Sequence, residues 1–246
     1  MTGAGPLFHV KICGVTTPAD ARLAAAAGAD AIGVNFVAGS PRRIDAVVAR
    51  AVAAAVPPGV AVVGVFAGMP PDEIARLVRE VGLTAVQLHG QFAGAGADLP
   101  EACAAIRAAA GGVPVIRALR LGADGLAEGR RWIAAATAGG AAPAMAIIDA
   151  TVPACAAAGA LGGTGARVDW RALSAEAGLG LPWALAGGLD PENVAEAIRI
   201  TGAAAVDVAS GVESAPGRKD PERLRAFVAA ARTAMAEGAG RPPGGG

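Results

Sequence analysis

Val10-Lys11-Ile12-Cys13-Gly14 decides the fold, because an apolar strand there runs directly into a cysteine and a turn-forming glycine. Further short apolar runs follow along the chain. Each ends near a polar residue or a glycine, and each is followed by an Ala-rich segment with helical character. Near-continuously apolar strands that alternate with helices indicate parallel strands covered by helices.

The predicted strands form a complete set for a closed barrel. They span residues 8–12, 31–36, 61–66, 85–88, 113–119, 145–148, 183–186 and 204–208. Eight such units close without edges, and one barrel of this type needs roughly 250 residues. An open doubly wound sheet is the alternative, which the absence of a GxGxxG after the first strand disfavours. We predict a single (βα)8 TIM barrel over residues 8–236, a flexible segment over residues 1–7 and a disordered tail over residues 237–246.

Several helix ends are marked by capping residues. Thr17 precedes a proline and is expected to cap the first helix, and Asp45 is expected to cap the second. Gly82 can end the third helix. The seventh helix is predicted to start at Asp190-Pro191-Glu192, and the last to span about residues 221–235.

Composition restricts the partners. The chain has 21 basic and 21 acidic residues, so its formal net charge is zero, and only 3% of residues are aromatic. A nucleic acid or an anionic membrane surface is therefore not expected as the main partner. No signal peptide is apparent, and apolar runs break before the ~20 residues that span a bilayer, which favours a cytoplasmic protein. Three separated cysteines and two distant histidines predict neither disulfides nor a metal site.

Polar residues at the predicted strand ends are the candidate site. All loops that follow the strands of such a barrel lie on one face, where active sites form. The side chains that we expect to converge there are Lys11, Cys13, Asn35, Arg42, His89, Arg117, Arg120, Asp149 and Asp207.

Glycine-rich segments follow the sixth, seventh and eighth strands. Glycine lets backbone N–H groups approach an anion closely, and the loops after strands seven and eight commonly bind phosphate in such barrels. The sequence therefore predicts a phosphate-bearing ligand, bound by Gly163, Thr164, Gly165, Gly187, Gly188, Ser210 and Gly211.

Cys13 is the candidate for proton or covalent chemistry. Most cysteines pack as small hydrophobic residues, but one at the C-terminal end of a barrel strand points into the mouth of the barrel. Its thiolate can act as a nucleophile or as a general base. Lys11 is a nearby cation that can favour the thiolate. The two residues lie on alternating strand positions, which leaves open whether they face each other.

Asp149 ends the sixth strand, nearly opposite the first. A partly shielded carboxyl group can stay protonated enough to act as a general acid. A cap or structural acceptor is the alternative for this residue. A thiol and a carboxyl group on opposite sides of a bound sugar would suit a proton transfer between carbon atoms.

The ordered set of strand-end motifs resembles phosphoribosylanthranilate isomerase of tryptophan biosynthesis. The match covers about residues 10–227, and although each motif is short, their order is specific. The motifs are Val10-Lys11-Ile12-Cys13-Gly14, Ser40-Pro41-Arg42, Val86-Gln87-Leu88-His89-Gly90, Ile148-Asp149, Gly162-Gly163-Thr164-Gly165, Ala186-Gly187-Gly188-Leu189, Val206-Asp207-Val208 and Ser210-Gly211-Val212-Glu213.

The resemblance implies a cofactor-free Amadori rearrangement of a small-molecule substrate. It implies that Asp149 is the general acid and Cys13 the general base. Arg42 would hold the anthranilate carboxylate, the glycine segments would bind the phosphate, and His89 and Asp207 would line the substrate site. We also predict that Lys11 binds the substrate. Arg43 stands where an aromatic residue is expected, which leaves open whether Arg42 or Arg43 holds the carboxylate.

Other readings remain. A sugar isomerase of histidine biosynthesis, or a dual-specificity enzyme, would be expected to carry an aspartate in place of Cys13. Indole-glycerol-phosphate synthase would need more lysines at strand ends than Lys11. A non-catalytic phosphate-binding barrel is a further alternative. The sequence leaves a monomer and a homodimer equally open, as it does the role of Cys155 and of a lid over residues 150–167.

Overall fold

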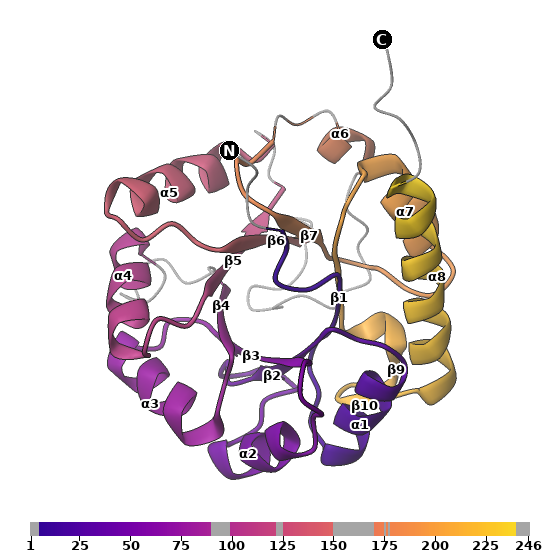
Figure 1. The fold of residues 1–246 in the computed structure, drawn as a ribbon, viewed down its shortest axis with the longest axis horizontal. Coiled ribbons are helices and arrows are strands. Elements are labelled where there is room, and N and C mark those ends of the chain that lie inside the picture. Colours follow the sequence, from indigo (N-terminus) through magenta and orange to yellow (C-terminus); the bar gives the residue numbers. More distant parts are fainter. Residues whose placement is uncertain are drawn as a thin grey trace.

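Eight parallel strands form a closed barrel in sequential order, surrounded by helices (Figure 1). This computed structural model describes residues 5–89, 99–121, 125–149, 170–174, 176 and 178–239. The prediction of a TIM barrel is confirmed. The strands are β1 Val10–Ile12, β2 Ala31–Asn35, β3 Ala61–Phe66, β4 Ala85–His89, β5 Val115–Arg120, β6 Met145–Asp149, β7 Trp183–Leu185 and β8 Val206–Val208.

The helices follow their strands as the sequence predicts. Ridges of aliphatic side chains on these helices pack against the outer face of the barrel, where most of the buried core lies. The helices are α1 Pro18–Ala26, α2 Ala46–Ala54, α3 Pro71–Val81, α4 Pro100–Ala109, α5 Ala127–Ala138, α6 Trp170–Ser174, α7 Val194–Thr201 and α8 Pro221–Ala239.

The inside of the barrel is lined mainly by small and aliphatic side chains. Residues paired across parallel strands face the same side of the sheet. Lys11 pairs with Ala31 on β2 and with Asp207 on β8, so all three face inward. The apolar part of this interior consists of Phe8, Ala31, Val63, Ala85, Ile116, Met145, Ile147, Ala184, Ala186 and Ala205. The many alanines leave room for the long side chain of Lys11, which is fully buried.

The predicted caps of three helices are confirmed. The Thr17 side chain accepts a hydrogen bond from the Asp20 amide at 3.1 Å, and the Asp45 side chain accepts one from the Val48 amide at 2.8 Å. Gly82 ends α3 in the left-handed conformation, with φ of 78°.

Helix α7 starts later than predicted. Residues 191–193 form a turn, and the helix begins at Val194. Asp190 Oδ1 accepts hydrogen bonds from the amides of Glu192 and Asn193, both at 2.9 Å. The Asn193 side chain in turn accepts one from the Asp190 amide at 3.0 Å. These side chains satisfy the backbone locally, so the turn replaces the first turn of helix.

A short hairpin after β8 was not predicted. A 3₁₀ turn, η2 (Ser210–Val212), leads into β9 (Glu213–Ala215), which pairs antiparallel with β10 (Arg218–Lys219). Gly217 adopts φ of 78° in the turn between these two strands. Helix α8 follows and extends to Ala239, four residues beyond its predicted end. The loop over residues 150–167, for which a lid role was left open, lies outside the described residues together with its Cys155 and its glycines.

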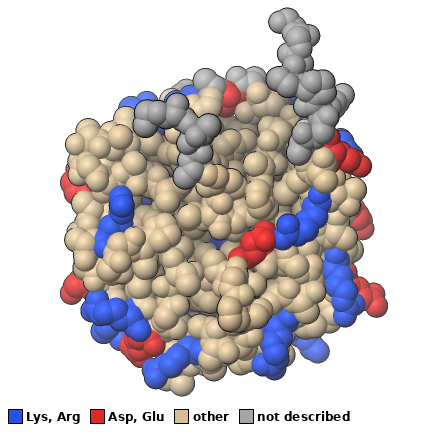
Figure 2. Space-filling model, in the orientation of Figure 1, with Lys and Arg blue, Asp and Glu red and all other residues tan. Residues whose placement is uncertain are grey.

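Charged side chains of both signs are spread over the face shown in Figure 2, without a patch of one sign. No helix in the described part of the chain has the length and hydrophobicity to cross a membrane. Nor do the described residues hold any group of three or more His, Cys, Asp or Glu side chains arranged to bind a metal ion.

Replacing Thr17 with alanine should destabilise the fold by about 1 kcal/mol, because one amide of the first turn of α1 loses its acceptor. Urea denaturation would measure this loss. Thr17→Ser keeps the hydroxyl and serves as the control. Equal stability of Thr17→Ala and wild type would contradict the assigned cap.

Candidate active site

One pocket at the C-terminal ends of the strands collects most of the predicted site residues. It is lined by Cys13, Asn35, Val37, Ser40, Arg42, Val65, Gln87, His89, Asp149, Ala186, Gly187, Gly188, Leu189, Asp207, Val208, Ala209 and Ser210. The strand ends therefore bring together side chains that are far apart in sequence. Lys11 does not line this pocket, and Gly163, Thr164 and Gly165 lie outside the described residues.

Cys13 directly follows β1, and its side chain lies on the same side as that of Lys11, as the spacing of two positions favours. Side chains two positions apart on a strand point the same way. A Cβ atom added to Gly33 of β2 would lie 2.8 Å from the Cys13 sulfur and 3.2 Å from Lys11 Nζ. Both groups therefore approach Gly33, whose missing side chain gives them space. Lys11 Nζ also donates a 2.8 Å hydrogen bond to Asp207 Oδ1.

The electrostatics around Cys13 oppose one another. Burial raises the pKa of the Cys13 thiol, Lys11 lowers it, Asp207 raises it and Lys219 lowers it, and the pKa ends above its ordinary value. Burial also lowers the pKa of Lys11, but Asp207 and Cys13 outweigh this and raise it. Lys11 is therefore a cation, and it partly offsets the cost of forming the thiolate.

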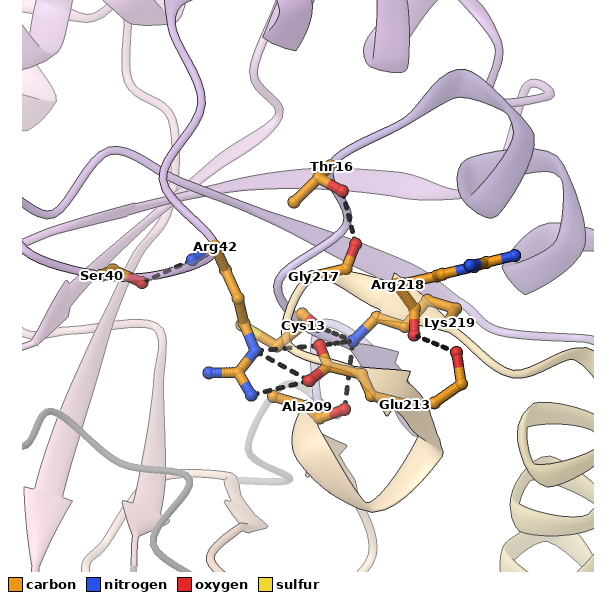
Figure 3. A network of polar contacts seen from close by, with 10 residues as sticks. Cys13, Thr16, Ser40, Arg42, Ala209, Glu213, Gly217, Arg218 and Lys219 are labelled. Carbon is orange, nitrogen blue, oxygen red and sulfur yellow. Dashed lines mark hydrogen bonds and ion pairs between the residues drawn. The ribbon is translucent and has the colours of Figure 1, made fainter.

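Arg42 lines the pocket through a network that the sequence analysis missed (Figure 3). Its Nε donates to Glu213 Oε1 at 2.9 Å, and its Nη2 donates to Glu213 Oε2 at 2.7 Å. Glu213 Oε1 also accepts a 2.8 Å hydrogen bond from the buried Lys219. Glu213 ends the motif Ser210-Gly211-Val212-Glu213, but only the β9–β10 hairpin brings Lys219 into contact with it.

His89 and Arg117 occupy opposite sides of the barrel wall. Burial, followed by the charge of Arg120, lowers the pKa of His89 to about 4. His89 is thus a neutral polar group at neutral pH. Arg117 was expected at the site, but it points outward and stacks on Trp132 of α5, with its guanidinium carbon 4.5 Å from the ring centroid. Side chains alternate between the two faces of β5, and Arg117 falls on an outward-facing position.

Asp149 lies at the pocket beside a cation. It pairs in register with Arg120 of β5, and both face inward. Burial lowers the pKa of Arg120, while the charge of Asp149 raises it. Asp149 is thus a half-buried carboxyl group at the pocket with a positive neighbour.

Glycines shape the pocket at β7 and β8. Gly187 and Gly188 have φ of 89° and 63°, which side-chain-bearing residues rarely adopt. A Cβ atom on Gly211 would overlap the Leu189 carbonyl group. The two loops therefore approach each other closely.

The pocket at the C-terminal ends of the strands is where TIM-barrel enzymes carry their active sites, and it holds groups suited to catalysis. The fold and the site therefore define a TIM-barrel enzyme. The family profile of N-(5'phosphoribosyl)anthranilate (PRA) isomerase matches residues 10–230. The chain belongs to this family.

Relatives agree on the family. An N-(5'-phosphoribosyl)anthranilate isomerase of Myxococcus xanthus is 45% identical over 92% of this chain and 96% of its own length. One of Neisseria gonorrhoeae is 44% identical, over 91% and 96%.

Solved structures agree as well. The phosphoribosyl anthranilate isomerase of Thermus thermophilus has a TM-score of 0.74 at 35% identity, with 92% of this chain and 98% of that chain covered. A phosphoribosyl anthranilate isomerase in complex with reduced 1-(o-carboxyphenylamino)-1-deoxyribulose 5-phosphate has a TM-score of 0.72 at 30% identity, with the same coverage.

Lys11→Met and Asp207→Asn should move the pKa of Cys13 in opposite directions. Loss of the Lys11 cation removes a charge that favours the thiolate, so the pKa should rise. Loss of the Asp207 anion should lower it. The rate of iodoacetamide alkylation at Cys13, followed by mass spectrometry from pH 7 to 11, measures the midpoint. Shifts of the same sign in both variants would contradict this account of the site.

Proposed function

We propose that this chain catalyses the isomerisation of N-(5-phosphoribosyl)anthranilate to 1-(2-carboxyphenylamino)-1-deoxyribulose 5-phosphate in tryptophan biosynthesis. The observation that supports this most is the presence of Cys13 and Asp149 in one pocket with Arg42 and the glycine turns. The substrate carries a carboxylate, a phosphate and a sugar between them. The pocket offers a cation for the first, backbone N–H groups for the second and two proton-transfer groups for the third.

Asp149 is the general acid in this proposal. Its carboxyl group protonates the oxygen of the ribose ring, and the ring opens to an iminium ion. The Cys13 thiolate then removes the proton from C2. The resulting enolamine tautomerises to the ketose, so the product has the same atoms as the substrate, and no cofactor is needed.

The raised pKa of Cys13 is compatible with a role as the general base. A base of higher pKa removes a carbon-bound proton more readily, while the thiolate fraction at neutral pH falls. Lys11 lies beneath Cys13 and offsets part of that fall. We therefore propose that Lys11 supports the base, in place of the direct contact with the substrate predicted from the sequence.

The phosphate is assigned to the loops after β7 and β8. Gly187, Gly188 and Ser210 line the pocket there. Gly211 lies behind them, where its lack of a side chain lets the two loops approach. Gly163, Thr164 and Gly165 stay part of the proposed phosphate site on the resemblance alone. His89 and Asp207 are proposed to contact the sugar.

The enzyme is proposed to act in the cytoplasm as a monomer or a homodimer. A related isomerase from Thermotoga maritima is described as dimeric. Sedimentation at several protein concentrations would distinguish the two states.

Cys13→Ser and Asp149→Asn should each lower kcat at least ~100-fold, the usual scale of acid–base catalysis. The upstream transferase supplies the substrate from anthranilate and phosphoribosyl pyrophosphate. The loss of the fluorescence of phosphoribosylanthranilate reports turnover. Cys103→Ala is the control, since Cys103 is buried on α4 away from the pocket. No turnover by the wild type would refute the proposed function, and full turnover by either variant would refute that residue's role.

Arg42→Ala should raise KM at least ~10-fold, because the substrate carboxylate loses a charge-assisted partner. Arg43 is exposed and does not line the pocket. Arg43→Ala is therefore the matched control, with KM close to that of the wild type. A rise in KM for Arg43→Ala instead would transfer the carboxylate to Arg43.

A further inference from the structure

We propose that Glu213 is a positioning residue that selects which edge of the Arg42 guanidinium meets the carboxylate of the substrate. The inference rests on the proposed function and adds a determinant of specificity to it. Glu213 touches neither the reacting atoms nor, in this proposal, the substrate.

Glu213 occupies one edge of the guanidinium completely. Arg42 Nε lies 2.9 Å and 3.2 Å from the two carboxylate oxygens, and Nη2 lies 2.7 Å from the second. A guanidinium group has five N–H donors in a rigid plane. The remaining donors are both N–H groups of Nη1 and one of Nη2, and the remaining bidentate edge consists of one N–H from each of these two nitrogens. Figure 3 shows the third nitrogen turned away from Glu213.

A second carboxylate can bind bidentately only at that remaining edge. Among the described residues, no hydrogen bond joins Nη1 to another group. Arg42 lines the pocket together with Cys13 and Asp149. The free edge is thus the part of Arg42 available to a ligand in the pocket.

Glu213 is itself held in place from the far side. Its side chain is 4% exposed, and Lys219 Nζ lies 2.8 Å from Oε1. Lys219 Nζ also donates to the carbonyl oxygens of Cys13 at 2.6 Å and Ala209 at 3.1 Å. One hydrogen-bonded frame therefore joins the arginine to the backbone of the proposed base.

Gly14 allows this arrangement. It adopts φ of 69°, and a Cβ atom there would overlap Cδ of Arg42. The arginine side chain therefore passes directly over the residue that follows Cys13. Gly14 therefore forms the turn after Cys13 and also leaves space for the Arg42 side chain.

The charges leave the network ready for one anion. Arg42 and Lys219 are the cations of this network, and Glu213 is its anion. Burial lowers the pKa of Lys219, while the charge and hydrogen bond of Glu213 oppose that shift. Burial raises the pKa of Glu213, but the hydrogen bonds from Arg42 and the charge of Lys219 together outweigh this and lower it, which favours the ionised form. A substrate carboxylate would neutralise the remaining positive charge. Without Glu213, the two cations would repel each other and Arg42 would lose its fixed orientation.

Glu213→Gln should therefore reduce the preference for a carboxylate-bearing ligand. Two probes would be titrated by calorimetry: reduced 1-(o-carboxyphenylamino)-1-deoxyribulose 5-phosphate and its counterpart without the carboxyl group. We expect the ratio of the two affinities to fall at least ~10-fold, as for loss of an interaction with a charged group. Affinity for the probe without the carboxyl group should change little. In turnover, KM should rise more than kcat falls.

Two further variants make the result specific. Glu213→Asp keeps the charge and should retain part of the preference. Glu80→Gln removes a glutamate from exposed pairs with Arg50 and Arg76 and should leave both affinities unchanged.

A parallel fall in both affinities for Glu213→Gln, or an unchanged ratio, would overturn the inference. Turnover of phosphoribosylanthranilate by the wild type, measured on the same preparation, keeps the two proposals apart. Its absence would refute the proposed function. Its presence with an unchanged ratio would refute the positioning role of Glu213 alone.

Discussion

The pairing of β1 with β8 is the constraint on which the rest of the site depends. It closes the barrel and sets Lys11 beside Asp207. A buried charge is costly without a partner of opposite charge, and removal of one partner of a buried pair typically costs about 3–5 kcal/mol. The same pairing carries on to Cys13, whose amide donates to the Val208 carbonyl at 2.7 Å. The strand pairing that closes the barrel therefore also fixes the surroundings of the proposed base.

The hairpin after β8 extends this constraint to the substrate side. Its turn at Gly217 returns Lys219 to the end of β1, where it donates to the Cys13 carbonyl. In that position Lys219 also contacts Glu213, which in turn contacts Arg42. Two buried lysines thus approach Cys13 from different sides, one through the barrel interior and one through the hairpin. Their charges oppose the effect of burial on the thiol.

Much of the fold could be predicted because local signals mark it. Strand β3 matches its predicted bounds from Ala61 to Phe66, since prolines and glycines flank a continuous apolar run. Helix α7 was misplaced because Asp190 and Asn193 satisfy the backbone through side-chain contacts that outweigh helix propensity. The β9–β10 hairpin has strands of three and two residues, too short to show an alternating pattern.

The sequence by itself determined the barrel, the face that carries the site and the residue types at the strand ends, because periodicity and turn residues are local properties. The order of its strand-end motifs also indicated the family that the comparisons show. Only the tertiary structure decided that Lys11 and Cys13 meet at Gly33, that Arg117 points outward, and that Glu213 and Lys219 hold Arg42. Those outcomes depend on register and on contacts between segments up to about 200 residues apart. The geometry of the closed barrel sets these contacts between distant segments, and a local sequence pattern contains no information about them.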